Sequence, residues 1–423
     1  MDISRNISLL YRYNLFTSVA LSVVANGVFL DQLMLKLDID IGDFGLIKSV
    51  MFLAPALSYQ LAIPLLRRLD WPEQVCAYSY ALRVSLPCLL PLFGIFGAGR
   101  GLITFAAMLI LGFSGAMAAF ANNSLSLIYR QTFPEDRYNH FMGKIMLLLN
   151  LPAVLINLGA AWILKYCENY QGNTYLWIFC LLQICTVLFE IPAFKAIRRV
   201  ESAPRKPVRF SFHPGDFLSP FRNPGYRRFL LFCSGFGVVF GIISTYFVVY
   251  LYNERHWSVM RVMIWSTLFS LISLVVSFHG GRRFDRSSFP ALFTLLSALI
   301  FLGTLATGFA LNTTWGILLA MFFIWNGWGS TLGAVLATVL NSAAGKLASR
   351  ENTIFFISLY SLTLNFGQFI GSAMAGSLLR MVSRGLPEGV FNFQGFFRLS
   401  SLAAFLLLFF TALWWRKQAV PKA

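Results

Sequence analysis

Charged side chains are scarce in this sequence. Only 12% of the 423 residues are Asp, Glu, Lys or Arg, whereas soluble domains carry about 25%. Hydrophobic residues make up 57% of the chain, which leaves too few polar groups to cover a water-facing surface. We therefore exclude a soluble fold and expect most of the surface to be solvated by lipid.

Motifs for metal binding, disulfides, nucleotide binding and catalysis are also missing. The six cysteines contain no C-x-x-C pair and most lie within apolar stretches, so we expect reduced thiols and no metal site. Neither a P-loop nor a glycine-rich nucleotide fingerprint occurs, which disfavours ATP-driven transport by this chain alone. No clustered set of catalytic side chains suggests a membrane-embedded enzyme. We predict a protein that is not an enzyme and needs no cofactor.

Long apolar runs are abundant. Twelve of them are long enough to cross a hydrocarbon core of about 30 Å. They cover approximately residues 12–34, 44–66, 75–97, 101–124, 141–164, 174–195, 227–251, 259–280, 289–309, 313–339, 353–380 and 396–415. The sequence therefore predicts an all-α integral membrane protein with twelve transmembrane helices.

One sequence pattern occurs twice, 215 positions apart, without a gap. The matches are Tyr11-Arg12 with Tyr226-Arg227, Arg67-Arg68-Leu69-Asp70 with Arg282-Arg283-Phe284-Asp285, and Asn150 with Asn365. Parallel duplication is typical of secondary transporters, whose substrate lies between two halves. We predict two six-helix bundles related by a pseudo-two-fold repeat, at residues 1–195 and 226–423. Residues 196–225, rich in Pro and Arg, are predicted to form a cytoplasmic linker between them.

Lysines and arginines gather on one side of the predicted membrane. If both termini are cytoplasmic, the outer side keeps few basic residues, chiefly Lys36, Lys165, Arg255, Arg380 and Arg384. This asymmetry is the positive-inside rule. It accounts for much of the net charge of +17, so we do not expect a nucleic-acid partner. Short loops and the lack of an N-terminal targeting segment predict a multi-pass protein of a bacterial inner membrane.

A short motif between the eighth and ninth apolar runs resembles the signature of the major facilitator superfamily. That signature begins with a glycine, has an aspartate four residues later and continues with a basic residue, as do Gly281, Asp285 and Arg286. The copy in the first half is degraded, with Leu66 in place of the glycine and Trp71 in place of the basic residue. The family usually keeps its better copy in the first half, so this chain departs from the pattern. The resemblance implies two halves that rock around a central substrate site.

Acidic residues at these loops are candidates for a cytoplasmic gate. The carboxylates of Asp70 and Asp285 can accept hydrogen bonds from helix N-termini or pair with an arginine. Arg137 and Arg350, in the loops after the fourth and tenth runs, are the predicted partners. The alternative is that both aspartates are solvated loop charges with no gating role.

Uncharged polar residues at membrane depth are the candidates for substrate contact. They are Asn26, Asn150, Asn157, Asn326, Asn365 and Gln368, with Trp325 and Trp328 flanking Asn326. An unpaired amide in hydrocarbon costs several kcal/mol, so these groups must face protein, water or ligand. Hydrogen bonds between neighbouring helices are the alternative, and packing is the more common role of any one tryptophan. For the repeated pair Asn150 and Asn365 we favour a cavity.

Charges within the apolar runs are few. Asp31 falls near the outer end of the first run and Glu190 near the inner end of the sixth, so we expect neither to be securely buried. Asp31 is the candidate for ion coupling by H⁺ or Na⁺. Arg83 in the third run either snorkels to the interface, forms a structural pair, or faces the cavity, where it would favour an anionic substrate.

These features together predict a secondary transporter. We expect a facilitator or an ion-coupled carrier that moves a small polar organic solute across the lipid bilayer by alternating access, as a monomer. A non-transporting membrane sensor or scaffold on the same fold would share the same sequence features.

Overall fold

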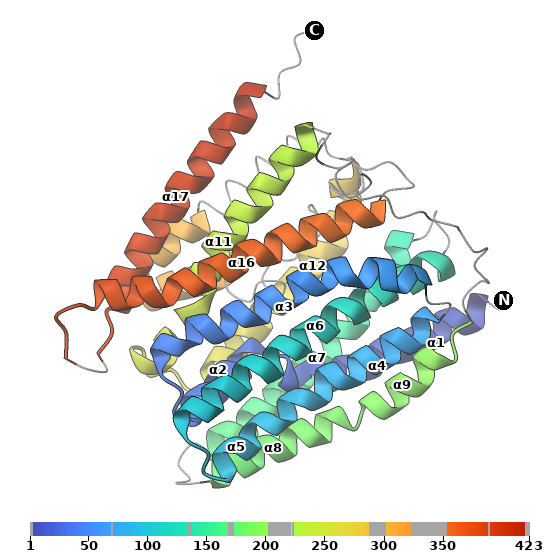
Figure 1. Ribbon diagram of the computed structural model, residues 1–423, viewed down its shortest axis with the longest axis horizontal. Helices are drawn as coiled ribbons and strands as arrows, with labels where there is room; N and C mark the ends of the chain where they lie inside the picture. Colours follow the sequence, from blue (N-terminus) through green and yellow to red (C-terminus); the bar gives the residue numbers. More distant parts are fainter. Residues whose placement is uncertain are drawn as a thin grey trace. The chain divides into compact units, whose positions relative to one another are not determined.

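The computed structural model describes residues 3–68, 71–133, 138–167, 173–201, 221, 224–286, 302–323, 353–387 and 390–418. Within these ranges all regular structure is helical and no strand occurs (Figure 1). The helices are α1 (Ile3–Val24), α2 (Gly27–Lys36), α3 (Ile41–Arg68), α4 (Pro72–Ser85), the 3₁₀ helix η1 (Leu86–Leu89), α5 (Leu90–Ile95), α6 (Arg100–Thr132), α7 (Tyr138–Cys167), α8 (Thr174–Val187), α9 (Glu190–Arg198), α11 (Pro224–Asn253), α12 (Val259–Arg286), α14 (Thr314–Phe323), α16 (Thr353–Val382) and α17 (Phe393–Gln418).

Several of these helices, alone or joined end to end, are long enough to cross a membrane. Within the described residues, seven helical segments are long and apolar enough to cross a bilayer. The prediction of an all-helical, multi-pass membrane protein is therefore confirmed. Helices suit a bilayer because each helix satisfies its own backbone hydrogen bonds.

The chain forms two compact units. The first comprises Met1–Ile41, Val50–Phe212 and Tyr252–Thr267, and the second comprises Gly42–Ser49, His213–Leu251 and Leu268–Ala423. Their limits differ from the predicted boundaries at 195 and 226, since the first turns of α3 belong to the second unit and the start of α12 to the first.

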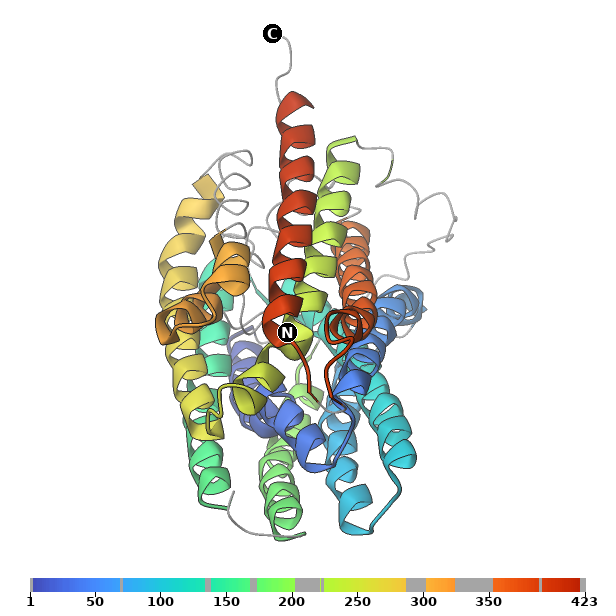
Figure 2. The same ribbon diagram turned by 90° about the vertical axis from the view of Figure 1, so that its left-hand side faces the viewer.

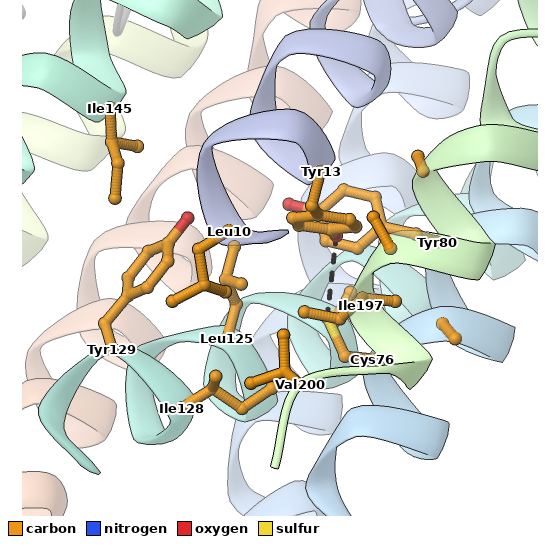
Figure 3. Packing of buried hydrophobic residues seen from close by; sticks show 14 of the residues in the cluster. Leu10, Tyr13, Cys76, Tyr80, Leu125, Ile128, Tyr129, Ile145, Ile197 and Val200 are labelled. Atoms are coloured by element: carbon orange, nitrogen blue, oxygen red, sulfur yellow. Dashed lines mark hydrogen bonds between the residues drawn. The ribbon is translucent and has the colours of Figure 1, made fainter. Parts of the chain in front are cut away.

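The first unit is built around α1. This helix packs against α7, α8 and α9, while α4 packs against α6 and α9, as the neighbouring ribbons show (Figure 1). The core between them contains Leu10 and Tyr13 of α1, Tyr80 of α4, Tyr129 of α6 and Ile197 of α9 (Figure 3). Aromatic and branched side chains thus fill the interior of the unit.

Glycines bring α11 and α16 into backbone contact in the second unit. A Cβ added at Gly241 would collide with the carbonyl oxygen of Gln368, and one at Gly371 with that of Val238. Gly237 and Gly367 extend the same contact by one turn on each helix. Small residues four positions apart allow two helices in lipid to approach until their backbones are in contact.

Aromatic rings join α11 to α17. The rings of Tyr250 and Phe397 meet edge to face, with centroids 5.5 Å apart, and Phe247 meets Phe397 at 6.0 Å. The two helices lie side by side in both views (Figures 1 and 2). Edge-to-face pairs of this kind stabilise a contact beyond the area that they bury.

The predicted spans at 12–34, 75–97 and 174–195 are each present, but each is divided into shorter helices. The first break separates α1 from α2 at Asn26, whose side-chain oxygen accepts a hydrogen bond from the Val28 amide at 2.9 Å. Asparagine is a favoured N-cap because its side chain satisfies a free amide of the first turn.

Prolines explain the other two breaks. Proline has no N–H, so Pro87 leaves the Arg83 carbonyl without its helical donor, and Ser114 of α6 donates to that carbonyl at 2.9 Å instead. Pro192 likewise leaves the Leu188 carbonyl free of its usual donor. That carbonyl accepts from the Ile191 amide at 3.2 Å, in a tighter turn. Hydropathy did not reveal these breaks, because it is averaged over a long window in which one Asn or Pro has little effect.

Candidate functional site

Glu190 is a buried carboxylate inside the first unit. It is 4% exposed and is the first residue of α9, at the break caused by Pro192. The Thr17 hydroxyl of α1 faces its carboxylate, but neither carboxylate oxygen accepts a well-formed hydrogen bond from a described residue. The expectation that Glu190 is not securely buried is wrong, because α9 packs against α1 and α4 and the side chain is covered. A carboxylate at a helix N-terminus is favoured by the free amides there.

Arg83 is the basic residue of α4. It lies in the last turn of that helix, which packs against α9, the helix that begins at Glu190. Its guanidinium carbon lies 5.5 Å from the centre of the Tyr80 ring, a cation–π geometry. No hydrogen bond joins the guanidinium to the Glu190 carboxylate, so the three positions predicted for Arg83 stay predictions.

Hydroxyl and thiol groups line the same region. The Tyr13 hydroxyl and the Cys76 sulfur are 3.5 Å apart (Figure 3), and the Tyr80 hydroxyl donates to Asn122 at 3.0 Å. The rings of Tyr13 and Tyr80 meet edge to face, 5.6 Å between centroids. We call the set of Tyr13, Thr17, Cys76, Tyr80, Arg83 and Glu190 the Glu190 cluster.

The chemistry available to this cluster is proton transfer and anion pairing. It contains one carboxylate and one guanidinium together with hydroxyls and a thiol that donate or accept hydrogen bonds. Among the residues that the structure describes, no group of three His, Cys, Asp or Glu side chains is placed to hold a metal ion. The sequence signal for the cluster was weak, because its members come from helices far apart in the chain.

A second polar seam joins α1 to α6. Asn14 is 1% exposed, accepts a hydrogen bond from the Tyr129 hydroxyl at 2.7 Å and donates to the Leu10 carbonyl at 2.7 Å. The Ser18 hydroxyl donates to the Leu149 carbonyl of α7. Sequence reasoning missed these residues, since each sits alone in an apolar run.

The predicted amides in the first unit have different surroundings. Asn26 caps α2 through its side-chain oxygen. Asn150 and Asn157 lie half-buried on α7, one near its middle and one further along. Among the predicted amides that the structure describes, Asn157 is one with a buried oxygen that accepts no hydrogen bond from a described residue.

The predicted amides in the second unit lie on α16. Asn365 is half-buried and donates to the Ser361 carbonyl of its own helix at 2.7 Å. Gln368 is 4% exposed, and its backbone lies at the glycine contact with α11. These two residues lie one turn apart on α16, and the backbone of Gln368 contacts α11.

The remaining predicted site residues divide into three groups. Asp70, Arg137, Trp325, Asn326, Trp328 and Arg350 lie outside the described residues. Gly281, Asp285 and Arg286 belong to the last turns of α12, and their side chains lie outside the described part of the chain. Asp31 is 1% exposed on α2, so the expectation that it is not securely buried is wrong. The break at Asn26 sets α2 apart as its own helix, whose Val28 to Met34 are all buried.

Comparison with known proteins identifies the family. A sequence model described as Major Facilitator Superfamily matches residues 14–349. The chain belongs to the major facilitator superfamily. Membership indicates a membrane transporter rather than an enzyme. A search of curated proteins by sequence finds no match.

Solved transporters of the major facilitator superfamily share the fold. The crystal structure of a point mutant of the nucleoside transporter NupG superposes with a TM-score of 0.67 at 13% identity, over 97% of this chain and 99% of that one. A bacterial homologue of the human drug peptide transporters PepT1 and PepT2 gives a TM-score of 0.64 at 12% identity, over 99% of both chains. The human organic anion transporter MFSD10 gives 0.57 at 14% identity, over 97% of this chain and 100% of that one. At these identities the likeness concerns the fold alone.

Proposed function

We propose that the protein is a secondary carrier that moves a small polar organic solute across the membrane by alternating access. Residues 1–195 and 226–423 are the proposed rocking halves, each with six of twelve transmembrane helices, related by the 215-residue repeat and joined by residues 196–225. The observation that carries the proposal is membership of a transporter family, together with apolar helices of membrane-spanning length that bury the carboxylate of Glu190. Ionisable groups at membrane depth are costly and mark functional sites.

The solute class follows from the polar groups available. The proposed contacts are Asn26, Asn150, Asn157, Trp325, Asn326, Trp328, Asn365 and Gln368. Among them Asn157 has the strongest case, since its buried oxygen is free to accept a hydrogen bond from a solute, whereas the Asn26 oxygen already caps α2. Structurally similar proteins named for nucleosides, organic anions and peptides are consistent with a polar organic cargo.

The proposed cytoplasmic gate consists of Asp70, Arg137, Gly281, Asp285, Arg286 and Arg350. We further propose that both termini are cytoplasmic, that the carrier acts as a monomer in a bacterial inner membrane, and that H⁺ or Na⁺ is its coupling ion if it is not a uniporter. Asp31 remains the ion-coupling residue predicted from the sequence. The positive-inside asymmetry supports the orientation.

Contacts at the start of α3 are the proposed outer counterpart of this gate. Lys48 donates from Nζ to the carbonyls of Thr245 at 3.2 Å and Ser244 at 3.5 Å on α11. Asp43 and Arg380 lie 3.6 Å apart at the same end, but both are partly exposed, so their pair contributes about 0–1 kcal/mol. Lys48 is therefore the stronger link between α3 and α11.

Replacing Lys48 by Met should loosen this end of the second unit. The change keeps the length of the side chain but removes charge-assisted hydrogen bonds worth about 1.5–3 kcal/mol. Amide hydrogen exchange in residues 42–49 and 244–251 is expected to accelerate about tenfold or more. Lys36→Met is the matched control, because Lys36 lies 5.1 Å over the Tyr175 ring in the first unit. Unchanged exchange at 244–251 would show that Lys48 does not hold α3 to α11.

Solute flux tests the carrier proposal directly. Purified protein in liposomes would be assayed for uptake of labelled uridine, alanyl-alanine, glucose and succinate, with and without pH and sodium gradients. We expect saturable uptake of at least one probe, competed by the unlabelled compound. Asn157→Ala should raise KM about tenfold through one lost hydrogen bond. The exposed Asn173, whose amide donates to the Ile95 carbonyl at 3.0 Å, serves as the control in Asn173→Ala. A folded protein that moves none of these probes would instead support a sensor or scaffold.

A further inference from the structure

We propose that the exposed side of α8 and α9 binds a phospholipid with an anionic headgroup, and that Lys195 and Arg199 hold its phosphate. The inference goes beyond the carrier proposal, because it needs only a chain embedded in a membrane and no particular solute. The occupant is identified by its chemistry, as two acyl chains joined to a headgroup of net negative charge.

An apolar stripe runs along the exposed side of α8 and the start of α9, which continues α8 along one edge of the first unit (Figure 1). Its members are Leu181, Ile184, Leu188 and Ile191, which are between 46% and 61% exposed. They recur every three or four residues, the spacing of one helix face. At the usual rise per residue the stripe is about 15 Å long, which matches one leaflet of a hydrocarbon core of about 30 Å. Acyl chains can therefore lie along its full length.

Basic residues continue this stripe. Lys195 follows Ile191 by four residues and Arg199 follows Lys195 by four, so both lie on the same face, and both side chains are exposed. The opposite side of α9 places Ala193 and Ile197 in the core of the first unit. The exposed face thus changes from apolar to basic between Ile191 and Lys195, as expected where hydrocarbon meets headgroups.

The other charged groups at this end of α9 are already engaged. The guanidinium of Arg198 lies 5.5 Å over the Phe194 ring. Glu201 is the acidic residue here, and it pairs with Arg5 at 3.5 Å. Among the residues that the structure describes, neither cation of the stripe takes part in an ion pair. Both cations are therefore available to an anion from outside the chain.

Continuity of the apolar and basic parts favours a phospholipid over a soluble anion. A phosphate ion would bind the cations and leave the stripe uncovered, whereas a phospholipid contacts both. The guanidinium of Arg199 can donate two parallel hydrogen bonds to phosphate oxygens, and the ammonium of Lys195 acts as a point charge. A headgroup of net negative charge is preferred, because a zwitterionic one brings a positive group close to the same two cations.

Native mass spectrometry of the full chain in detergent tests the site. The protein would be titrated with dioleoyl phosphatidylglycerol and, separately, with dioleoyl phosphatidylcholine, which has the same chains and a zwitterionic headgroup. We expect phosphatidylglycerol to bind more tightly. The double variant Lys195→Gln/Arg199→Gln should lower its affinity about 25-fold, since each basic residue near an anionic surface contributes about fivefold. Affinity for phosphatidylcholine should change far less.

Arg198→Gln is the matched control. It removes one charge from the same end of α9, but its guanidinium lies over Phe194, so the variant should keep the preference for phosphatidylglycerol. Lys195→Gln alone should lose about fivefold in affinity. Equal losses in these two variants would show a general effect of charge and overturn the site.

Three further outcomes would overturn the inference. The first is equal binding of both lipids by the wild type. The second is competition by glycerophosphoglycerol, the headgroup without chains, at the concentration of the lipid, which would indicate a site for free anions. The third is a protein dimer that dissociates in the double variant, which would make a second copy the occupant. Thermal unfolding in detergent without lipid checks that the variants fold, since substitutions of exposed residues have little effect on stability. The single variants repeat the test if the double variant unfolds early.

Discussion

Gly371→Ala is expected to destabilise the protein, whereas the same substitution at Gly159 is expected to stabilise it slightly. A Cβ at Gly371 would collide with the Val238 carbonyl of α11, and backbone cannot move aside as a flexible side chain can. Forcing one extra methyl group into a packed contact costs about 1–3 kcal/mol. Thermal unfolding of the detergent-purified protein would measure the difference.

The control position lies in the middle of a helix with free space around it. A Cβ at Gly159 on α7 meets no atom within 4 Å. Alanine there adds helix propensity worth about 0.5–1 kcal/mol. Opposite signs for the two variants would confirm that the glycines of α11 and α16 are needed for close approach. Equal effects would mean that α11 and α16 do not touch through their backbones.

Arg83→Met is expected to destabilise the protein at neutral and high pH, and Glu190→Gln is expected to restore stability in the double variant. Removal of the guanidinium takes the positive charge from α4, the helix that packs against α9 and its buried Glu190. Because no hydrogen bond joins the two groups and Arg83 is half-buried, we expect a loss of about 1–3 kcal/mol, below the range for a directly bonded buried pair. The loss should shrink as the pH falls, since a proton then neutralises Glu190.

A double-mutant cycle measures this coupling. Unfolding free energies of the wild type, the two single variants and the double variant give the interaction energy between positions 83 and 190. Arg198→Met is the control, because the Arg198 guanidinium lies over Phe194 at 5.5 Å on the same helix as Glu190. Additive effects of Arg83→Met and Glu190→Gln, with no dependence on pH, would show that the two residues do not interact.

Particular residues show why part of the site escaped prediction. Hydropathy located Glu190 and Arg83 within or near apolar runs, yet it could not show that Glu190 is buried, because burial depends on the packing of α9 against α1 and α4. Pro87 and Pro192 were visible in the sequence. Whether each proline would break its helix depended on which group bonds the carbonyl that it leaves free. For the Arg83 carbonyl this group is the Ser114 hydroxyl on α6.

Polar residues with several possible partners were hardest to interpret. Asn26 was predicted to contact solute, but its oxygen bonds the Val28 amide two residues later. Asn14 and Lys48 were missed, although both bond groups on other helices. An isolated polar residue in an apolar run signals only that some partner exists, because leaving it unbonded in hydrocarbon is costly. Which partner it finds depends on helix packing.

The sequence by itself determined that this protein is an all-helical membrane protein of the major facilitator superfamily. Length and hydropathy establish the membrane helices, since a bilayer selects helices by the free energy of transferring each run of about 20 residues, and the match to the family model adds the superfamily. Only the tertiary structure decided that Glu190 is buried where α9 packs against α1 and α4, and that Gly241 and Gly371 join α11 to α16. Hydropathy is a property of one helix and its solvent, whereas these contacts depend on which helices become neighbours. That choice is made by close packing and hydrogen bonding between segments far apart in the chain.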